Sequence, residues 1–139
     1  MPGRRHKART IALQALYEAD AVARKPEEVT ERLLGEAGLS EENSEFVRGL
    51  VNGTIKNREE IDRSIRKHAP AWPVDQIALI DRNILRLAIY EILFDNKVPV
   101  KVAVNEAVEL AKAFGSDNSS KFVNGVLGAV KTPADREKA

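Results

Sequence analysis

The spacing of the apolar residues constrains this chain most strongly. In residues 5–23, alanine, isoleucine and leucine recur at intervals of three and four, as one face of an α-helix requires. Similar spacing continues through most of the chain, which is rich in Leu, Ala, Glu, Lys and Arg, whereas the alternation typical of strands is scarce. The sequence therefore predicts an all-α fold, a helical bundle of about seven helices.

Proline, glycine and capping residues divide these helices. We expect helical segments over about 5–23, 26–37, 41–68, 74–79, 82–94, 99–114 and 120–130. Ser40 and Asp81 are the expected N-caps of two of them. Gly49 and Gly53, four residues apart on the longest helix, indicate a close helix crossing. We predict a single domain over 1–139, with halves at 1–70 and 71–133 joined near Pro70–Pro73, and a frayed tail at 134–139.

The charges are segregated along the chain although they nearly cancel. The formal net charge is +1, yet residues 1–26 hold six Lys and Arg against two acids. Residues 27–45 hold one basic residue against seven acids, and residues 46–70 hold six basic residues against three acids. Such asymmetry within a neutral total is informative about binding partners rather than about the fold.

Several classes of protein are excluded by what the sequence lacks. Without cysteine it forms no disulfide, thiol nucleophile or cysteine metal site. Its two histidines, His6 and His68, have no second ligand at metal-binding spacing, and no glycine-rich cofactor loop occurs. Apolar runs such as Leu87–Tyr90 are far shorter than the roughly 20 residues that cross a bilayer. We therefore expect a cytoplasmic protein that is not an enzyme and uses no metal or cofactor.

The first candidate site is the basic run Arg4-Arg5-His6-Lys7-Ala8-Arg9 near the N-terminus. No acid follows it before Glu18. Such runs are typical of arginine-rich RNA-binding segments, which order on contact with phosphate. The alternative is a terminus that only aids solubility. Cations at a helix N-terminus oppose the macrodipole by roughly 0.3–1 kcal/mol each, a conflict that a bound polyanion would remove.

A second candidate is the polar loop at 116–120 with Lys121 and Phe122 directly after it. The start of a helix can receive phosphate on its backbone N–H groups. A cation beside an aromatic ring also suits a single-stranded nucleic acid, whose bases stack while its phosphates are neutralised. The alternative is that Phe122 is only the first core residue of the last helix. A third candidate is Tyr17 with Asp75 and Asp81, which could bind a basic protein. The alternative is that Tyr17 packs in the core, Asp75 is a solvated surface residue and Asp81 caps a helix.

Together these segments resemble the NusB family of transcription antitermination factors. The blocks that carry the resemblance are Arg4-Arg5-x-x-Ala8-Arg9, Ala15-Leu16-Tyr17, Asp81–Glu91, Val98–Lys112, Phe114-Gly115 and Lys121–Leu127. They extend over nearly the whole chain, whereas residues 23–72 match only loosely. The resemblance implies an all-helical fold in two subdomains.

The resemblance also implies a function and its residues. It implies binding to boxA-type RNA of ribosomal RNA leader transcripts, a partner called NusE that is also a small-subunit ribosomal protein, and a place in the RNA polymerase antitermination complex. Residues that match the family's RNA-binding surfaces are Arg4, Arg5, Lys7, Arg9, Asn118, Lys121 and Phe122. Those that match its NusE-binding surface are Tyr17, Asp75 and Asp81. Some family members form homodimers, so a second copy is a further candidate partner.

The sequence is also compatible with two other functions. One is a helical adaptor or homodimer that binds only proteins, with the basic run as a plain tail. The other is the RNA-targeting module of a methyltransferase, which the absence of a glycine-rich loop for a methyl donor disfavours.

Overall fold

The computed structural model describes residues 2–130, and side chains from Arg5 onward. These residues form seven α-helices, a 3-10 turn and a π-helical turn, with no strand among them. In chain order the elements are α1 (Pro2–Val22), α2 (Pro26–Ala37), α3 (Glu41–Lys56), α4 (Arg58–His68), η1 (Val74–Gln76), α5 (Leu79–Tyr90), η2 (Glu91–Asp95), α6 (Val100–Phe114) and α7 (Ser119–Ala129). The predicted all-α fold is confirmed, and the predicted tail at 134–139 lies outside the described residues.

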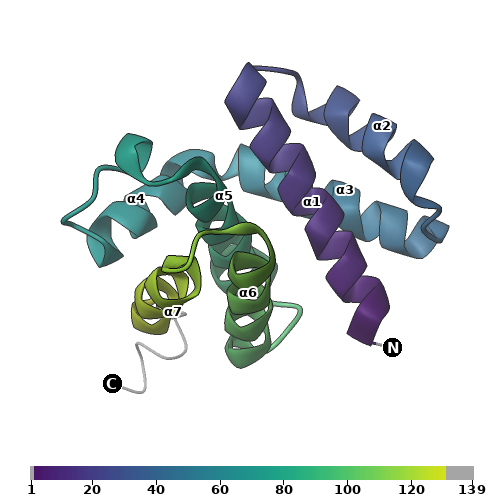
Figure 1. Cartoon of the computed structure of the whole chain (residues 1–139). Helices are drawn as coiled ribbons and strands as arrows, with labels where there is room; N and C mark the ends of the chain where they lie inside the picture. The colour runs from purple at the N-terminus through teal and green to yellow at the C-terminus, as the bar shows by residue number, and fades with distance from the viewer. Residues whose placement is uncertain (1, 131–139) are drawn as a thin grey trace.

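Helix α5 lies at the centre of the molecule. It packs against α1, α3, α4, α6 and α7, and Figure 1 shows α1, α2 and α3 to the right of it, α4 and α7 to the left, and α6 below it. Its side chains Ile84, Leu85 and Ile89 are fully buried. Helix α4 precedes the predicted junction at Pro70–Pro73, yet it packs on α5 and α7. The two halves therefore share one continuous hydrophobic core.

Helix α1 packs closely on its neighbours because its inner face is made of small residues. Ala8, Ala12 and Ala15 are completely buried where α1 meets α3 and α5. Leu16 extends the same face and is 2% exposed. The periodicity that predicts the buried face of this helix is thus confirmed.

The single long helix predicted over 41–68 is wrong. The chain breaks at Asn57, whose φ and ψ of −104° and 15° depart from helical values. The Asn57 side chain donates to the Gly53 carbonyl oxygen at 2.8 Å, as asparagine does when it competes with helical backbone bonds. The break lets α4 turn so that Ile61 and Ile65 are completely buried.

Only one of the two glycines expected at a helix crossing lies at one. A Cβ at Gly53 would overlap the ring of Tyr90, so α3 and α5 approach closely there only because residue 53 has no side chain. Gly49 is exposed and has no atom near the position of a Cβ, so the prediction for it is wrong.

The two predicted N-caps have different outcomes. Ser40 is confirmed, since its Oγ accepts a hydrogen bond from the backbone N–H of Asn43 at 3.1 Å. Asp81 does not cap α5, which begins at Leu79. The helix starts earlier because the backbone N–H of Arg82 already donates to the Ala78 carbonyl oxygen, so Asp81 lies within the first turn.

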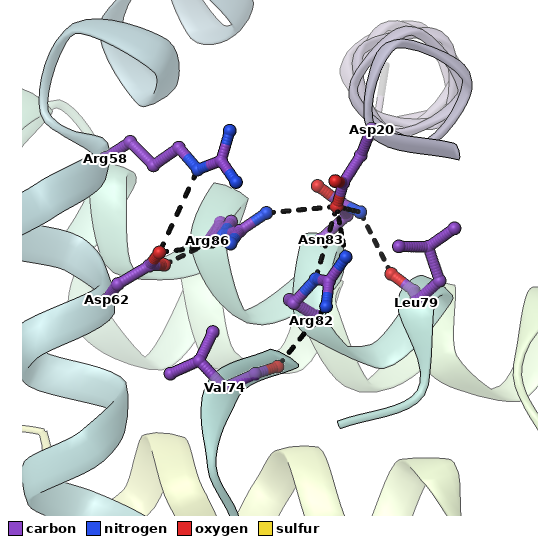
Figure 2. Close-up of polar contacts among 8 residues, drawn as sticks. All are labelled: Asp20, Arg58, Asp62, Val74, Leu79, Arg82, Asn83 and Arg86. Atoms are coloured by element: carbon purple, nitrogen blue, oxygen red, sulfur yellow. Dashed lines mark hydrogen bonds and ion pairs between the residues drawn. The ribbon is translucent and has the colours of Figure 1, made fainter. Parts of the chain in front are cut away.

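A polar cluster ties α1, α4 and α5 together (Figure 2). Asp20 Oδ2 accepts hydrogen bonds from Arg82, Asn83 and Arg86 at 2.9, 3.0 and 3.1 Å. Arg86 also pairs with both carboxylate oxygens of Asp62 at 2.8 and 3.0 Å. Burial alone would raise the pKa of Asp20, but the donors from Arg82 and Asn83 outweigh burial and hold that pKa below its ordinary value.

Candidate nucleic-acid interface

The basic run at the N-terminus forms the first turns of α1. The Arg5 guanidinium lies 3.9 Å from the centre of the Phe46 ring, and its Nη2 is 3.7 Å from Glu42. Lys7 is exposed, and its Nζ donates to the Ala37 carbonyl oxygen at 3.2 Å. The side chain of Arg4 lies outside the described residues. Lys7 and the exposed part of Arg5 are thus available to a polyanion.

Arg9 is turned into the protein instead of toward solvent. Its side chain is 4% exposed and forms a two-pronged pair with Glu91, whose side chain is 3% exposed, at 2.7 and 2.9 Å. Burial alone would lower the pKa of Arg9, but the hydrogen bond and the charge of Glu91 raise it. In this arrangement Arg9 fixes α1 to η2 and presents no charge to a ligand.

The loop before α7 is held in a fixed shape by its own hydrogen bonds. The Ser119 Oγ accepts from the backbone N–H of Ser116 at 2.8 Å and lies 3.2 Å from the Ser116 Oγ. A Cβ at Gly115 would overlap the Ser119 side chain and lie 2.8 Å from the Ala111 carbonyl oxygen. Only glycine therefore permits the chain to turn this closely after α6.

This loop presents the second set of predicted RNA-binding residues around a cavity of about 250 Å³. Asn118 and Phe122 line the cavity; Asn118 is exposed and its side chain makes no capping bond. Phe122 is half-buried and packs partly on the core, so the functional and packing interpretations of it are compatible. Lys121 is exposed beside them and forms no ion pair within residues 5–130.

A larger groove of about 860 Å³ lies between α1, α2, the start of α5 and the end of α6. Tyr17 lines it and is 40% exposed, so it is not a core residue. Phe114 is the last residue of α6, and it is also 42% exposed in this groove. Glu18 and Glu36 add negative charge to an otherwise mainly apolar surface.

The three residues predicted to meet a protein partner lie apart from one another. Tyr17 lines the large groove, Asp81 lines the small cavity, and Asp75 is exposed on η1. Asp81 is 7% exposed, and its Oδ1 is buried without a hydrogen-bond partner. The structure therefore places Asp81 beside Asn118 and Phe122, which the sequence assigned to a different surface.

The two predicted RNA-binding segments lie toward opposite ends of α6 (Figure 1). His6 hydrogen-bonds Glu106 at 2.9 Å near the middle of α6, whereas Asn118 follows the end of that helix. The nine residues from Glu106 to Phe114 alone span about 12 Å, because each of the eight steps between them rises 1.5 Å. A ligand that touches both segments must extend along this length.

Trp72 belongs to the cavity, although it was not among the residues that the sequence predicted to bind a ligand. It is 53% exposed and lines the cavity opposite the loop before α7. The signal that could have identified it is its place between Pro70 and Pro73, because prolines on both sides keep a residue out of a helix and at the surface.

Neither a metal-binding group nor a membrane-spanning helix is found among the described residues. No three His, Cys, Asp or Glu side chains between residues 5 and 130 are grouped so that they could hold a metal ion. None of the helices described is both long enough and apolar enough to span a membrane.

The described residues form an all-α protein with the small cavity and the large groove on its surface, and comparisons identify the family. The family model described as "NusB family" matches residues 6–132. The "Transcription antitermination protein NusB" of Dehalococcoides mccartyi (strain ATCC BAA-2266 / KCTC 15142 / 195) is 54% identical over 135 residues, which are 96% of this chain and 94% of that relative. The chain belongs to the NusB family, whose members are transcription antitermination factors and not enzymes.

Solved structures agree with this assignment. NusB of T. maritima superposes with a TM-score of 0.87 at 32% identity, and the match covers 97% of each chain. A structure described as the antitermination factors NusB and NusE in complex with dsRNA superposes with a TM-score of 0.85 at 31% identity, covering 93% of this chain and 96% of that one.

Proposed function

We propose that this chain binds single-stranded boxA-type RNA of ribosomal RNA leader transcripts together with NusE, and so helps RNA polymerase to avoid termination. One observation carries the RNA part: Asn118 and Phe122 line a cavity with exposed Lys121 beside it. The related complex of NusB, NusE and dsRNA supports both proposed partners. A protein that acts on a nascent transcript is expected to work in the cytoplasm.

The proposed RNA path runs from the start of α1 to the start of α7. Lys7 and Arg5 supply charge at one end, and Lys121 supplies charge at the other. Asn118 and Phe122 offer an amide and an aromatic face to the bases, as single-stranded recognition requires. Arg4 and Arg9 are both kept as proposed RNA contacts. Arg9 can reach RNA only if its ion pair with Glu91 breaks.

NusE is proposed to bind near the start of α5. Tyr17 offers it an exposed aromatic ring in the large groove, where Glu18 and Glu36 favour a basic partner. Asp75 on η1 extends this surface, and Asp81 lies where it meets the RNA cavity. The apolar character of the same groove favours the alternative function, a protein-binding adaptor or a homodimer without a direct role in RNA binding.

Point substitutions test this proposal better than removal of the first nine residues. Such a deletion would take away Ala8 and Arg9, both of which are buried, and so would damage the fold. We expect Lys7→Gln and Lys121→Gln each to weaken binding of a labelled boxA-type oligomer, measured by fluorescence anisotropy. Tyr17→Ala should weaken NusE binding and spare RNA. If neither lysine variant changes RNA affinity, the proposed RNA path is wrong, whereas failure of the unmodified protein to bind the oligomer would favour the adaptor function.

A further inference from the structure

The cavity beside α7 contains more than the residues assigned to RNA above. Trp72 stands on the loop after α4, Asp81 on the first turn of α5, and Asn118 with Phe122 on the segment that begins α7. Its volume of about 250 Å³ is small, and its lining is mainly apolar. Two stretches of the chain, residues 72–81 and 116–122, thus line an open space suited to one flat group.

Two aromatic side chains contribute to this space. Trp72, the only tryptophan of the chain, keeps 53% of its surface exposed, and Phe122 is only half-buried. Large aromatic surfaces exposed at a cavity are stacking platforms for bases, because every base presents a π face. Because Trp72 is so exposed, it contributes little to the hydrophobic core. Stacking on a flat ligand would bury more of its ring.

Asp81 gives the cavity a polar preference. Only 7% of Asp81 is exposed, and its Oδ1 has no hydrogen-bond partner. Its place in the first turn of α5 lets the helix dipole stabilise a negative charge, but no N–H group bonds to Oδ1. A buried acceptor without a donor is costly, so an occupant that brings a donor is favoured.

The donor that such an acceptor selects is an exocyclic amino group. Cytosine, adenine and guanine each carry one, and carboxylates accept from cytosine N4 in nucleic-acid recognition. Uracil has a carbonyl oxygen, which repels a carboxylate, where cytosine has its amino group, and its single donor on that edge is the ring N3–H. Asn118 at the rim can bond the remaining edge of the base or the backbone.

We propose that this cavity holds one unstacked base of the bound RNA, with Trp72 as a stacking residue and Asp81 as the residue that favours amino-bearing bases over uracil. The inference rests on the proposed RNA-binding function and deepens it by naming the class of base. It also gives Trp72 a role that the sequence blocks resembling the family do not include.

The intrinsic fluorescence of Trp72 provides a direct test with the unmodified protein. Oligocytidylate and oligouridylate of equal length are titrated at low salt, and anisotropy of the labelled oligomers measures their affinities in parallel. We expect a saturable change in Trp72 emission with oligocytidylate and a preference over oligouridylate of about 5- to 150-fold. Saturated binding without any change in emission would overturn the stacking role.

Variants then separate stacking from selection. Trp72→Ala should weaken both oligomers by about 5- to 150-fold and leave their ratio unchanged. Asp81→Asn keeps the shape and supplies both a donor and an acceptor, so the preference should fall to near equality. Glu59→Gln, an exposed carboxylate on α4, is the matched control and should change nothing. A preference that persists in folded Asp81→Asn would overturn the selection role.

The same titrations distinguish this inference from the function on which it rests. If neither oligomer binds at low salt, the RNA-binding function fails and this inference fails with it. If both bind, and Trp72→Ala and Asp81→Asn match the unmodified protein in affinity and preference, only the base-cavity inference is wrong.

Discussion

The two regions proposed to contact RNA differ in how far their charges are already neutralised. At the start of α1, Arg9 is paired with buried Glu91 and Arg5 lies between Phe46 and Glu42. At the start of α7, Lys121 is exposed and unpaired within residues 5–130. The basic stretch of sequence therefore offers a ligand less charge than its composition suggests. Carboxylates of the protein itself pair with the basic side chains and so determine how much of their charge is available to a ligand.

The largest expected effect tests whether Arg9 is structural. Arg9→Gln leaves the Glu91 carboxylate buried without its partner, which costs about 3–5 kcal/mol of the free energy of unfolding. Urea unfolding measures this cost, with Lys7→Gln on the exposed side of the same turns as the control. A loss below about 1 kcal/mol for Arg9→Gln would show that Arg9 is not held as described.

An intermediate effect is expected at the other region. Phe122→Ala should weaken single-stranded RNA binding by about 1–3 kcal/mol if a base stacks on the ring. Because Phe122 also packs against the core, the variant must first be shown to be folded by its thermal unfolding. Unchanged affinity in a folded variant would show that no base stacks on Phe122. Lys121 would then be the main contribution of this region to RNA binding.

A smaller effect of opposite sign sharpens the comparison. Glu42 is exposed and lies 3.7 Å from Arg5, so it competes with RNA for that guanidinium. Glu42→Gln should therefore strengthen RNA binding by about 0.2–1 kcal/mol, the range for an exposed pair. Glu59→Gln removes a distant exposed carboxylate and serves as the control. If the two variants behave alike, only net charge matters and the pairing of Arg5 does not.

The helices could be predicted because their signal is local. Alanine and leucine at helical spacing predict the buried face of α1, and Ser40 predicts the start of α3. The break at Asn57 could not, because an asparagine side chain competes for the backbone only when burial of Ile61 and Ile65 favours the turn. Local patterns thus identify elements, while tertiary packing decides where a long element breaks.

The candidate site was predictable in part for a similar reason. The residues of the loop before α7 are adjacent in sequence, so Asn118 and Phe122 could be grouped without a structure. Glu91 is 82 residues from Arg9, and Trp72 lies far from Phe122 along the chain. Pairing and cavity formation over such separations depend on the fold, and no local pattern reveals them.

The dependence of RNA affinity on salt tests the central claim most directly. Four cations from the N-terminal run would give a slope of log K against log[salt] near −3, at about −0.7 for each contact. With Arg9 withdrawn and Lys7 and Lys121 free, we predict that Lys7→Gln combined with Lys121→Gln makes the slope shallower by about 1.4, whereas folded Arg9→Gln leaves it unchanged. An unchanged slope in the double lysine variant, or a shallower one in Arg9→Gln, would contradict the account.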